Sequence, residues 1–316
     1  MWRSLSSSQF GLMNVVDNVV CAAGASMPDL GDSHTLLCAS DYSGQHKASA
    51  FEAYSFLIVG SASWSTWENL RLAIREQHLN TRRMSFKGLN DNAKRRVLPY
   101  FLDAADELDG LLAVVLVDKK VGSLFTRSRR FDFTGIPEYA GYGSQAFERL
   151  LRSVHLLSFF LGGLSRPGQD VFWFTDADDF AANEARIRTL TDLFGNVSSH
   201  YSSHPLGHFR CGTSSSCDNG KLQVEDLCAI CDLAAGTATE LLNRHREEGT
   251  VPNSRFIVPL PPRLSGKSAF LGGWLARRSS RLRRLILSLE AQAGSTSIRV
   301  KRLVLHGLGG VAPTTP

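Results

Sequence analysis

Three aspartates stand where apolar runs of the chain end or on a short helical turn. Asp41 closes the run LLCASD, Asp176 closes VFWFTD, and Asp232 lies within LCAICDLAAG. A carboxylate beside a hydrophobic core is costly without a partner, and open α/β sheets bind ligands at the carboxyl ends of their strands. Converged carboxylates repel one another unless a cation or a proton lies between them. The pattern therefore predicts a functional site if the three acids meet.

Two strand ends and a nearby helix can deliver carboxylates to one or two Mg²⁺ or Mn²⁺ ions, because hard cations prefer oxygen ligands. Such ions activate a water and stabilise the leaving oxygen of a phosphodiester. The alternative is that each aspartate only caps a helix or a turn. Asp178 and Asp179 are better capping candidates than Asp176, since they stand closer to the next expected helix. We therefore expect Asp41, Asp176 and Asp232 to be metal ligands.

The elements that must position these acids follow from hydrophobic periodicity and turn residues. Strands are expected at 34–40, 53–61, 111–118, 171–176 and 208–214, and helices at 64–78, 90–108, 142–164, 183–195 and 222–248. The short polar connection 45–52 predicts that the first two strands form an antiparallel hairpin. The order predicts an α/β fold with a mixed sheet, opened by that hairpin and flanked by helices. It is compatible with an RNase H-like fold.

The composition indicates a globular, non-membrane protein, with 316 residues that are 43% hydrophobic and 21% charged. We expect an irregular segment over 1–33, an RNase H-like α/β domain over 34–250, and a proline-containing linker with a basic tail over 251–316. No run approaches the ~18 apolar residues of a membrane span. The N-terminus makes a poor secretory signal, and six cysteines are too few for a disulfide framework. A cytoplasmic location is therefore expected.

The basic charge of the chain is concentrated near its C-terminus. From Arg263 onward there are ten Lys or Arg residues and one acid, Glu290. The segment 274–292 is expected to form an amphipathic helix with leucines on one face and arginines on the other. The arginines are expected to contact nucleic acid phosphates, with an anionic membrane or no partner as alternatives. They are Arg277, Arg278, Arg281, Arg283 and Arg284.

Four short motifs of the chain stand out together: the segment DYSG, which Asp41 opens, RRMSFKGLND (82–91), LVDK (116–119) and LQVEDLCAICDLAAG (222–236). They resemble motifs of a bacterial family called domain of unknown function 3800. The resemblance spans roughly residues 14–246.

The resemblance implies an RNase H-like fold with Asp41, Asp176 and Asp232 as its acidic site residues and Lys87 as a fourth catalytic residue. One departure is Tyr42, which stands where the family commonly has Glu. The expected function is thus a divalent-metal-dependent nuclease, or a catalytically degenerate relative of one, acting on nucleic acid. The alternative is a non-catalytic nucleic-acid-binding or protein-interaction module, which applies if the acids do not converge.

Two further motifs support weaker alternatives. The run Asp176-Ala177-Asp178 resembles the Asp-x-Asp with which many glycosyltransferases hold the Mn²⁺ of a nucleotide sugar. Cys228 and Cys231 have zinc-like spacing, but they lie in an apolar helical stretch, where cysteine is commonly a small buried hydrophobe. No glycine-rich phosphate loop and no Gly-x-Ser-x-Gly elbow occurs.

Overall fold

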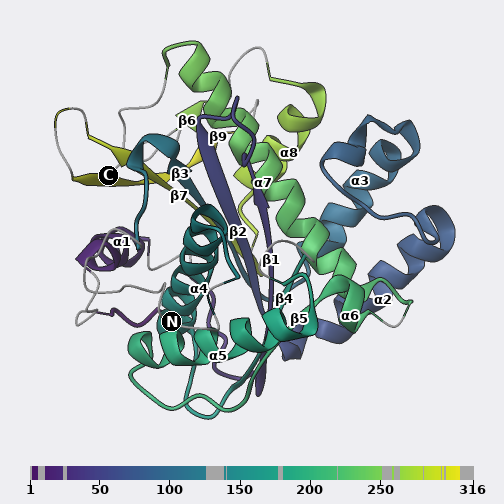
Figure 1. Ribbon diagram of the computed structural model, residues 1–316. Helices are drawn as coiled ribbons and strands as arrows, with labels where there is room; N and C mark the ends of the chain where they lie inside the picture. The colour runs from purple at the N-terminus through teal and green to yellow at the C-terminus, as the bar shows by residue number, and fades with distance from the viewer. Residues whose placement is uncertain are drawn as a thin grey trace.

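A mixed sheet forms the centre of the fold in the computed structural model (Figure 1). The structure describes residues 2–5, 11–23, 27–125, 139, 141–176, 181–218, 220–250, 258–259, 264–279, 281–292, 294 and 297–306. Within these residues the sheet has seven strands in the order β5-β4-β1-β2-β3-β7-β8. Their bounds are β1 Thr35–Ser43, β2 Phe51–Gly60, β3 Gly110–Asp118, β4 Asp170–Thr175, β5 Phe209–Thr213, β7 Leu282–Ala291 and β8 Ile298–Leu303. A separate pair joins β6 (Val258–Pro259) to β9 (Leu305–His306).

The strand directions divide the sheet around β2. It runs antiparallel to both neighbours, β1 and β3. By contrast β1, β4 and β5 are parallel to one another, as are β3 and β7. The predicted opening hairpin is confirmed, with Ser43 paired to Ala53 at its closed end. The predicted α/β class with a mixed sheet and flanking helices is also confirmed.

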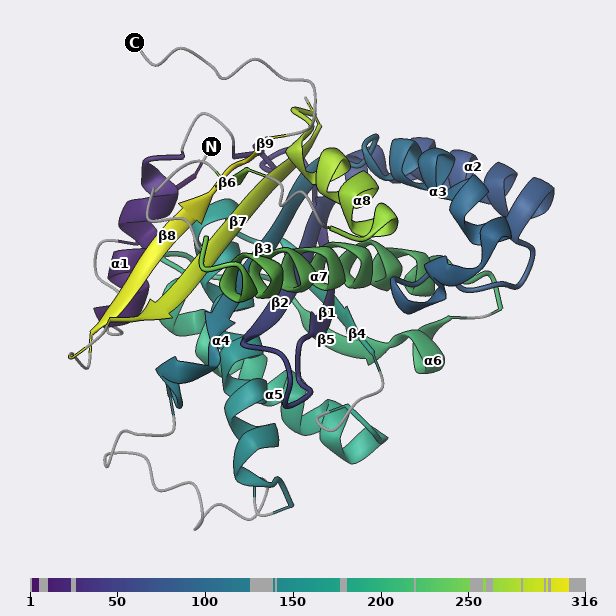
Figure 2. The same cartoon turned by 90° about the horizontal axis from the view of Figure 1, so that it is seen from above.

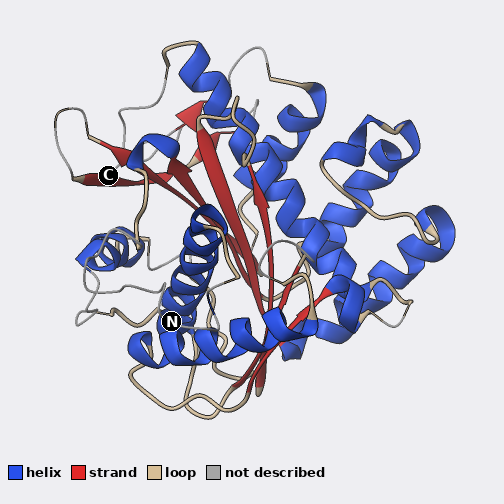
Figure 3. Ribbon diagram, in the orientation of Figure 1, coloured by secondary structure: helices blue, strands red, loops and turns tan. Residues whose placement is uncertain are grey.

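Helices cover both faces of the sheet (Figures 2 and 3). They are α1 Gly11–Cys21, α2 Trp64–Ile74, α3 Asn92–Ala105, α4 Ser144–Leu164, α5 Glu184–Tyr201, α6 Ser214–Cys217, α7 Gln223–Glu247 and α8 Gly266–Ala276, with short turns at 61–63, 75–79, 87–90 and 119–121. One buried cluster joins α1, α4 and α5 to one face, and a second joins α2, α3, α7 and α8 to the other. No helix among the described residues is long and apolar enough to cross a lipid bilayer.

The helix predicted over 274–292 is wrong. Helix α8 ends at Ala276, and the residues from Leu282 onward form β7, which pairs with β3 in the parallel direction. Leu285 and Leu287 pack on the α4 side of the sheet, whereas Leu282 and Ile286 pack on the α7 side. A leucine-rich run with both faces buried suits a central strand as well as a helix. The segment forms a strand because β3 offers an edge with which it can pair, and the basic segment thereby becomes part of the sheet.

The segment expected to be irregular over 1–33 also contains a helix. Helix α1 buries Met13, Val16 and Val20 in the cluster on the α4 side. Its Asp17 accepts hydrogen bonds from Trp2 Nε1 at 3.0 Å and from the Leu5 backbone at 3.1 Å. The described N-terminal residues are therefore part of the core packing.

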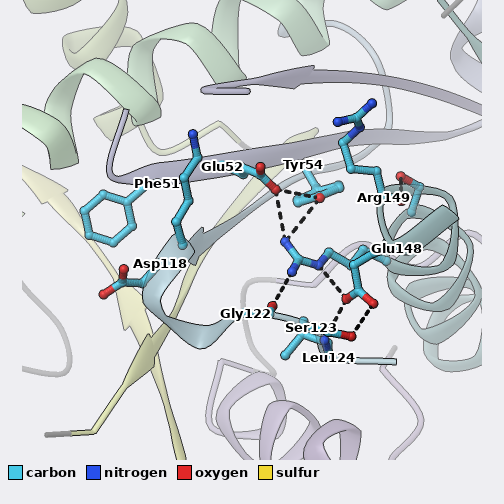
Figure 4. A network of polar contacts seen from close by, with 12 residues as sticks. Phe51, Glu52, Tyr54, Asp118, Gly122, Ser123, Leu124, Glu148 and Arg149 are labelled. Carbon is cyan, nitrogen blue, oxygen red and sulfur yellow. Dashed lines mark hydrogen bonds and ion pairs between the residues drawn. The ribbon is translucent and has the colours of Figure 1, made fainter. Parts of the chain in front are cut away.

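Buried Arg152 ties α4 to the sheet through its contacts with Glu148, Glu52 and Gly122, which are labelled in Figure 4. Arg152 donates to Glu148 Oε1 at 2.9 Å, to Glu52 Oε2 at 3.0 Å and to the carbonyl of Gly122. Glu148 also accepts from Ser123 Oγ at 2.7 Å and from the Leu124 N–H at 2.6 Å. Burial alone would raise the pKa of Glu148, but these donors lower it. The network joins α4, β2 and the chain after β3.

We expect Arg152→Met to lower the free energy of unfolding by about 3 kcal/mol or more, because it leaves Glu148 and Glu52 charged and poorly partnered. The side chain of Arg152 is 8% exposed. The control is Arg188→Met in α5, whose 73% exposed side chain pairs with Glu184 and should cost less than about 0.5 kcal/mol. Urea unfolding measures both, and equal losses would contradict a structural role for the buried network.

Candidate active site

All four residues predicted for the site line one cavity. It has a volume of about 820 Å³, and Asp41, Lys87, Asp176 and Asp232 are among its lining residues. This volume is within the range of about 300–1,000 Å³ that ligand sites occupy. The three acids therefore lie around the same cavity. Their metal-binding and catalytic roles stay predictions.

The pairing of β1 with β4 brings two of the acids together. Ser40 of β1 is opposite Thr175 of β4 in a parallel register, so Asp41 and Asp176 are the next residues along both strands. Side chains alternate between the two faces of a strand. Ala39 and Phe174 pack in the cluster on the α7 side, and Asp41 and Asp176 share that side by alternation. Both carboxylates leave the sheet toward α7.

Helix α7 presents the third acid on a stripe that follows the helical period. Glu225, Ala229, Asp232, Gly236 and Asn243 recur at spacings of three, four or seven residues, and all five line the cavity. The opposite face of α7 buries its aliphatic side chains against β1 and β2. Helix α7 therefore has two faces with different roles: the apolar face holds the helix to the sheet, and the other face lines the cavity.

A glycine shapes the wall of the cavity after Asp41. Gly44 has a φ of +81°, a conformation that other residues rarely adopt. A Cβ built there would lie 2.1 Å from the carbonyl oxygen of Phe51. The glycine of the DYSG segment is therefore required by both the backbone conformation and the close approach of β2.

A short segment before α3 covers the middle of α7 and carries Lys87. The Phe86 N–H donates to Asp232 Oδ2 at 2.7 Å. A Cβ at Gly236 would lie 2.4 Å from Phe86 Cγ, so the ring fits only because that helix position is glycine. Lys267 of α8 donates to the Phe86 carbonyl at 3.2 Å and lies 4.2 Å from the ring centroid. Two distant parts of the chain, α7 and α8, thus hold Phe86, and with it Lys87, at the cavity.

The carboxylates influence one another electrostatically. Burial raises the pKa of Asp232, and the charge of Asp176 adds to this effect, while the Phe86 N–H, Lys87 and Lys267 oppose it. Burial likewise raises the pKa of Glu225, with Asp176 adding and Arg83 opposing. A cation bound between these acids would relieve their repulsion.

The donor set fits Mg²⁺ or Mn²⁺ in part. Carboxylate oxygens are the ligands these ions prefer. Within the described residues, no three His, Cys, Asp or Glu side chains are grouped closely enough to hold a metal ion. Mg²⁺ usually binds through one or two carboxylates together with substrate phosphates and waters, so it does not require a complete set of protein ligands. A cation at this site would therefore need ligands from waters or from a substrate in addition to the carboxylates.

The two cysteines of α7 have the character of core residues. Cys228 and Cys231 are buried, and burial raises the pKa of both thiols well above the ordinary value. The thiol of Cys231 donates to the carbonyl of Ala39 at 3.4 Å. A zinc site needs thiolates, and this environment disfavours them.

Tyr42 lies mainly on the other side of the sheet from Asp41. Its hydroxyl contacts Ser40 Oγ at 2.9 Å, and its ring packs edge-on against Tyr54 with the centroids 5.6 Å apart. Tyr42 belongs to the cluster on the α4 side.

The arginines expected to bind nucleic acid are mostly engaged within the protein. Arg277 pairs with Asp103 at 2.8 Å, Arg281 pairs with Glu107 at 3.2 Å, and Arg284 pairs with Asp106. These acids lie at or just after the end of α3, beside the start of β7 where Leu282 pairs with Gly110. Arg283 donates to the Ser279 carbonyl at 3.1 Å, and Arg278 is exposed. The predicted face of free arginines on a helix is therefore wrong.

Sequence reasoning missed Glu225, Phe86, Gly236 and Lys267. The helical spacing of Glu225 and Gly236 from Asp232 was a usable signal. Nothing local indicated Lys267, because its role depends on α8 packing near α7. The Asp-x-Asp of the glycosyltransferase alternative includes Ala177 and Asp178, which lie outside the described residues.

Comparisons with known proteins give no independent assignment. No protein-family model matches the chain, and no curated protein matches it. The functional argument therefore depends on the site itself.

We expect Gly236→Ala to lower the free energy of unfolding by about 1–3 kcal/mol, because the new methyl group displaces Phe86. The control is Gly273→Ala in α8, where a Cβ has nothing within 4 Å. That helix substitution should instead stabilise by about 0.5–1 kcal/mol. Urea unfolding distinguishes the two, and a gain in both variants would show that the Phe86 contact is dispensable.

We expect Asp232→Asn to stabilise the protein at neutral pH. Asparagine keeps an acceptor for the Phe86 N–H and removes a charge that burial and Asp176 disfavour. Because the pKa of Asp232 is higher in the folded chain, its charged carboxylate destabilises the fold fully above that pKa. This destabilisation disappears below the unfolded pKa of about 3.9. The gain should therefore shrink as pH falls. Urea midpoints between pH 7.5 and pH 3.5 test this, and a gain that is constant with pH would contradict it.

Proposed function

We propose that this chain is a divalent-metal-dependent phosphodiesterase of RNase H-like fold that acts on nucleic acid. One observation carries the proposal: carboxylates from the ends of β1 and β4 and from α7 line the same cavity, together with Lys87. Carboxylates that meet at strand ends suit the binding of hard cations, and a neighbouring ammonium suits the binding of a phosphate.

The strand order supports the fold part of the proposal. An RNase H-like sheet opens with antiparallel strands and continues with parallel ones. Here β3-β2-β1-β4-β5 are neighbours, and β2 alone of these five runs in the opposite direction. The DYSG segment at the end of β1 and the DLAAG run on α7 are the motifs that resemble the family of domain of unknown function 3800.

The residues of the chain have separable roles in this proposal. Asp41 and Asp176 would hold the cation, which when bound would activate a water and stabilise the leaving oxygen. Lys87 is exposed at the cavity and neutralises a substrate phosphate. Asp232 accepts the Phe86 N–H with one oxygen and so fixes the segment that carries Lys87, while its other oxygen adds to the negative charge of the site.

Two observations favour a second candidate, a binding module without catalysis. Tyr42 replaces the acid that the family commonly has at this position. No complete set of metal-ligating side chains occurs in the described part of the chain. In this case the same cavity binds a phosphodiester and leaves it intact.

We expect the purified protein to cleave labelled DNA or RNA with Mg²⁺ or Mn²⁺ and to be inactive with a chelator. Asp41→Asn and Asp176→Asn should each lower the rate at least about a hundredfold, because each removes one of the negative charges that would hold the cation at the cavity. Asp192→Asn in α5, an exposed aspartate outside the cavity lining, is the control. Unchanged cleavage in Asp41→Asn would refute the proposal. Binding without cleavage by the unmodified chain would favour the binding module.

A further inference from the structure

A dense group of cations lies beside the candidate active site. Between residues 82 and 96 there are six Lys or Arg side chains and one acid, Asp91. The six are exposed, or half-buried in the case of Lys94. We infer that they form the surface that binds the phosphate backbone of nucleic acid, an inference that rests on the proposed function of the cavity. This surface, the basic ridge, consists of Arg82, Arg83, Lys87, Lys94, Arg95 and Arg96.

Two contacts link the segments that form the basic ridge. Arg82 Nη1 lies 3.9 Å from Asp91 Oδ2, and Asp91 caps α3 by accepting from the Ala93 N–H at 2.7 Å. Lys94 Nζ lies 2.8 Å from the position of a Cβ built at Gly88. These contacts hold the segment that carries Lys87 beside the first turn of α3, so a phosphate backbone that crosses both segments can meet cations of each.

The basic ridge reaches the rim of the cavity at two points. Lys87 belongs to both the ridge and the cavity lining. Arg83 Nε lies 3.7 Å from the Oε1 atom of Glu225, which also lines the cavity. A strand held by its phosphates on the ridge therefore has a phosphodiester within reach of the carboxylates of Asp41 and Asp176.

The basic ridge differs from the basic tail in its balance of charge. Three tail arginines face the acids Asp103, Asp106 and Glu107, and intramolecular ion pairs neutralise them. Among the described residues, Asp91 lies 3.9 Å from Arg82 and Glu225 lies 3.7 Å from Arg83, while Asp232 interacts with Lys87, so three acids oppose the six cations of the ridge. When cations that have no acid beside them bind phosphates, the counterions condensed on the nucleic acid are released. This release is the main source of non-specific affinity for nucleic acid.

An exposed aromatic ring adjoins the basic ridge. Tyr100 is 60% exposed and lies one helical turn after Arg96 on α3. Its ring stacks on His78, with the centroids 6.1 Å apart. Exposed aromatic rings beside cations are the usual platforms for unpaired bases. An anionic membrane fits less well, because α3 buries its apolar residues Val97, Leu98 and Phe101 instead of exposing them to a bilayer.

The test is binding of labelled single-stranded and duplex oligonucleotides by fluorescence anisotropy in the presence of a chelator. The ridge variant is Arg82→Gln/Arg95→Gln/Arg96→Gln, which leaves Lys87 in the cavity unchanged. It should weaken binding more than about tenfold near 0.1 M salt and lower the slope of log K against log salt by about two to three. Circular dichroism and urea unfolding verify that the variant is folded.

The matched control is Arg210→Gln/Arg278→Gln/Arg299→Gln, which removes three exposed arginines of β5, the tail and β8. It should leave affinity within about twofold. Equal weakening by the control, or no binding by the unmodified chain, overturns the inference, and so does binding only to phosphatidylserine vesicles. Because the measurement needs no cleavage, a failure of Asp41→Asn to abolish hydrolysis refutes the catalytic proposal alone.

Discussion

The parallel pairing of β1 with β4 is the constraint on which the candidate site depends. A slip of one residue would turn the side chain after β4 to the opposite face of the sheet. The register is fixed from the α5 side, where Trp173 Nε1 donates to Ser40 Oγ at 2.9 Å and the indole packs against Phe194 with the centroids 5.0 Å apart. The side of the sheet opposite the cavity thus sets the position of Asp41 relative to Asp176.

Helix α7 depends on a second buried constraint at its N-terminus. Asp226 is fully buried and receives the guanidinium groups of Arg71, at 3.1 Å, and of Arg75. Burial raises the pKa of Asp226, while the two arginines oppose that effect. A buried ion pair adds little net stability, but loss of one partner is costly. In this protein the main effect of the Asp226 ion pairs is to fix the position of α7. They tie its first turn to the end of α2, less than two turns before Asp232.

The sequence predicted those parts of the site that depend on local patterns. The ends of β1 and β4, the opening hairpin and the helix that carries Asp232 all follow from apolar runs and their boundaries. The strand at 282–291 could not be predicted in this way, because LRRLILSLEA suits a helix and a strand equally and only the open edge of β3 decides between them. The contacts of Phe86 with Asp232, Gly236 and Lys267 were likewise hidden, since they join residues far apart in the chain. The basic tail shows a further limit: composition gives the number of charges, but only the folded chain shows which of them are neutralised.

The place of β7 in the sheet has a consequence for synthesis of the chain on the ribosome. β3 is apolar up to its last residue, Asp118, and its partner on one side is not made until α4, α5, α7 and α8 have been made. Until then a nascent chain presents an unpaired hydrophobic strand edge, which is a template for aggregation. Closing so long a connection is also slow. Folding of this sheet is therefore completed late, and a chaperone or ribosome-bound factor that shields β3 would act in that interval.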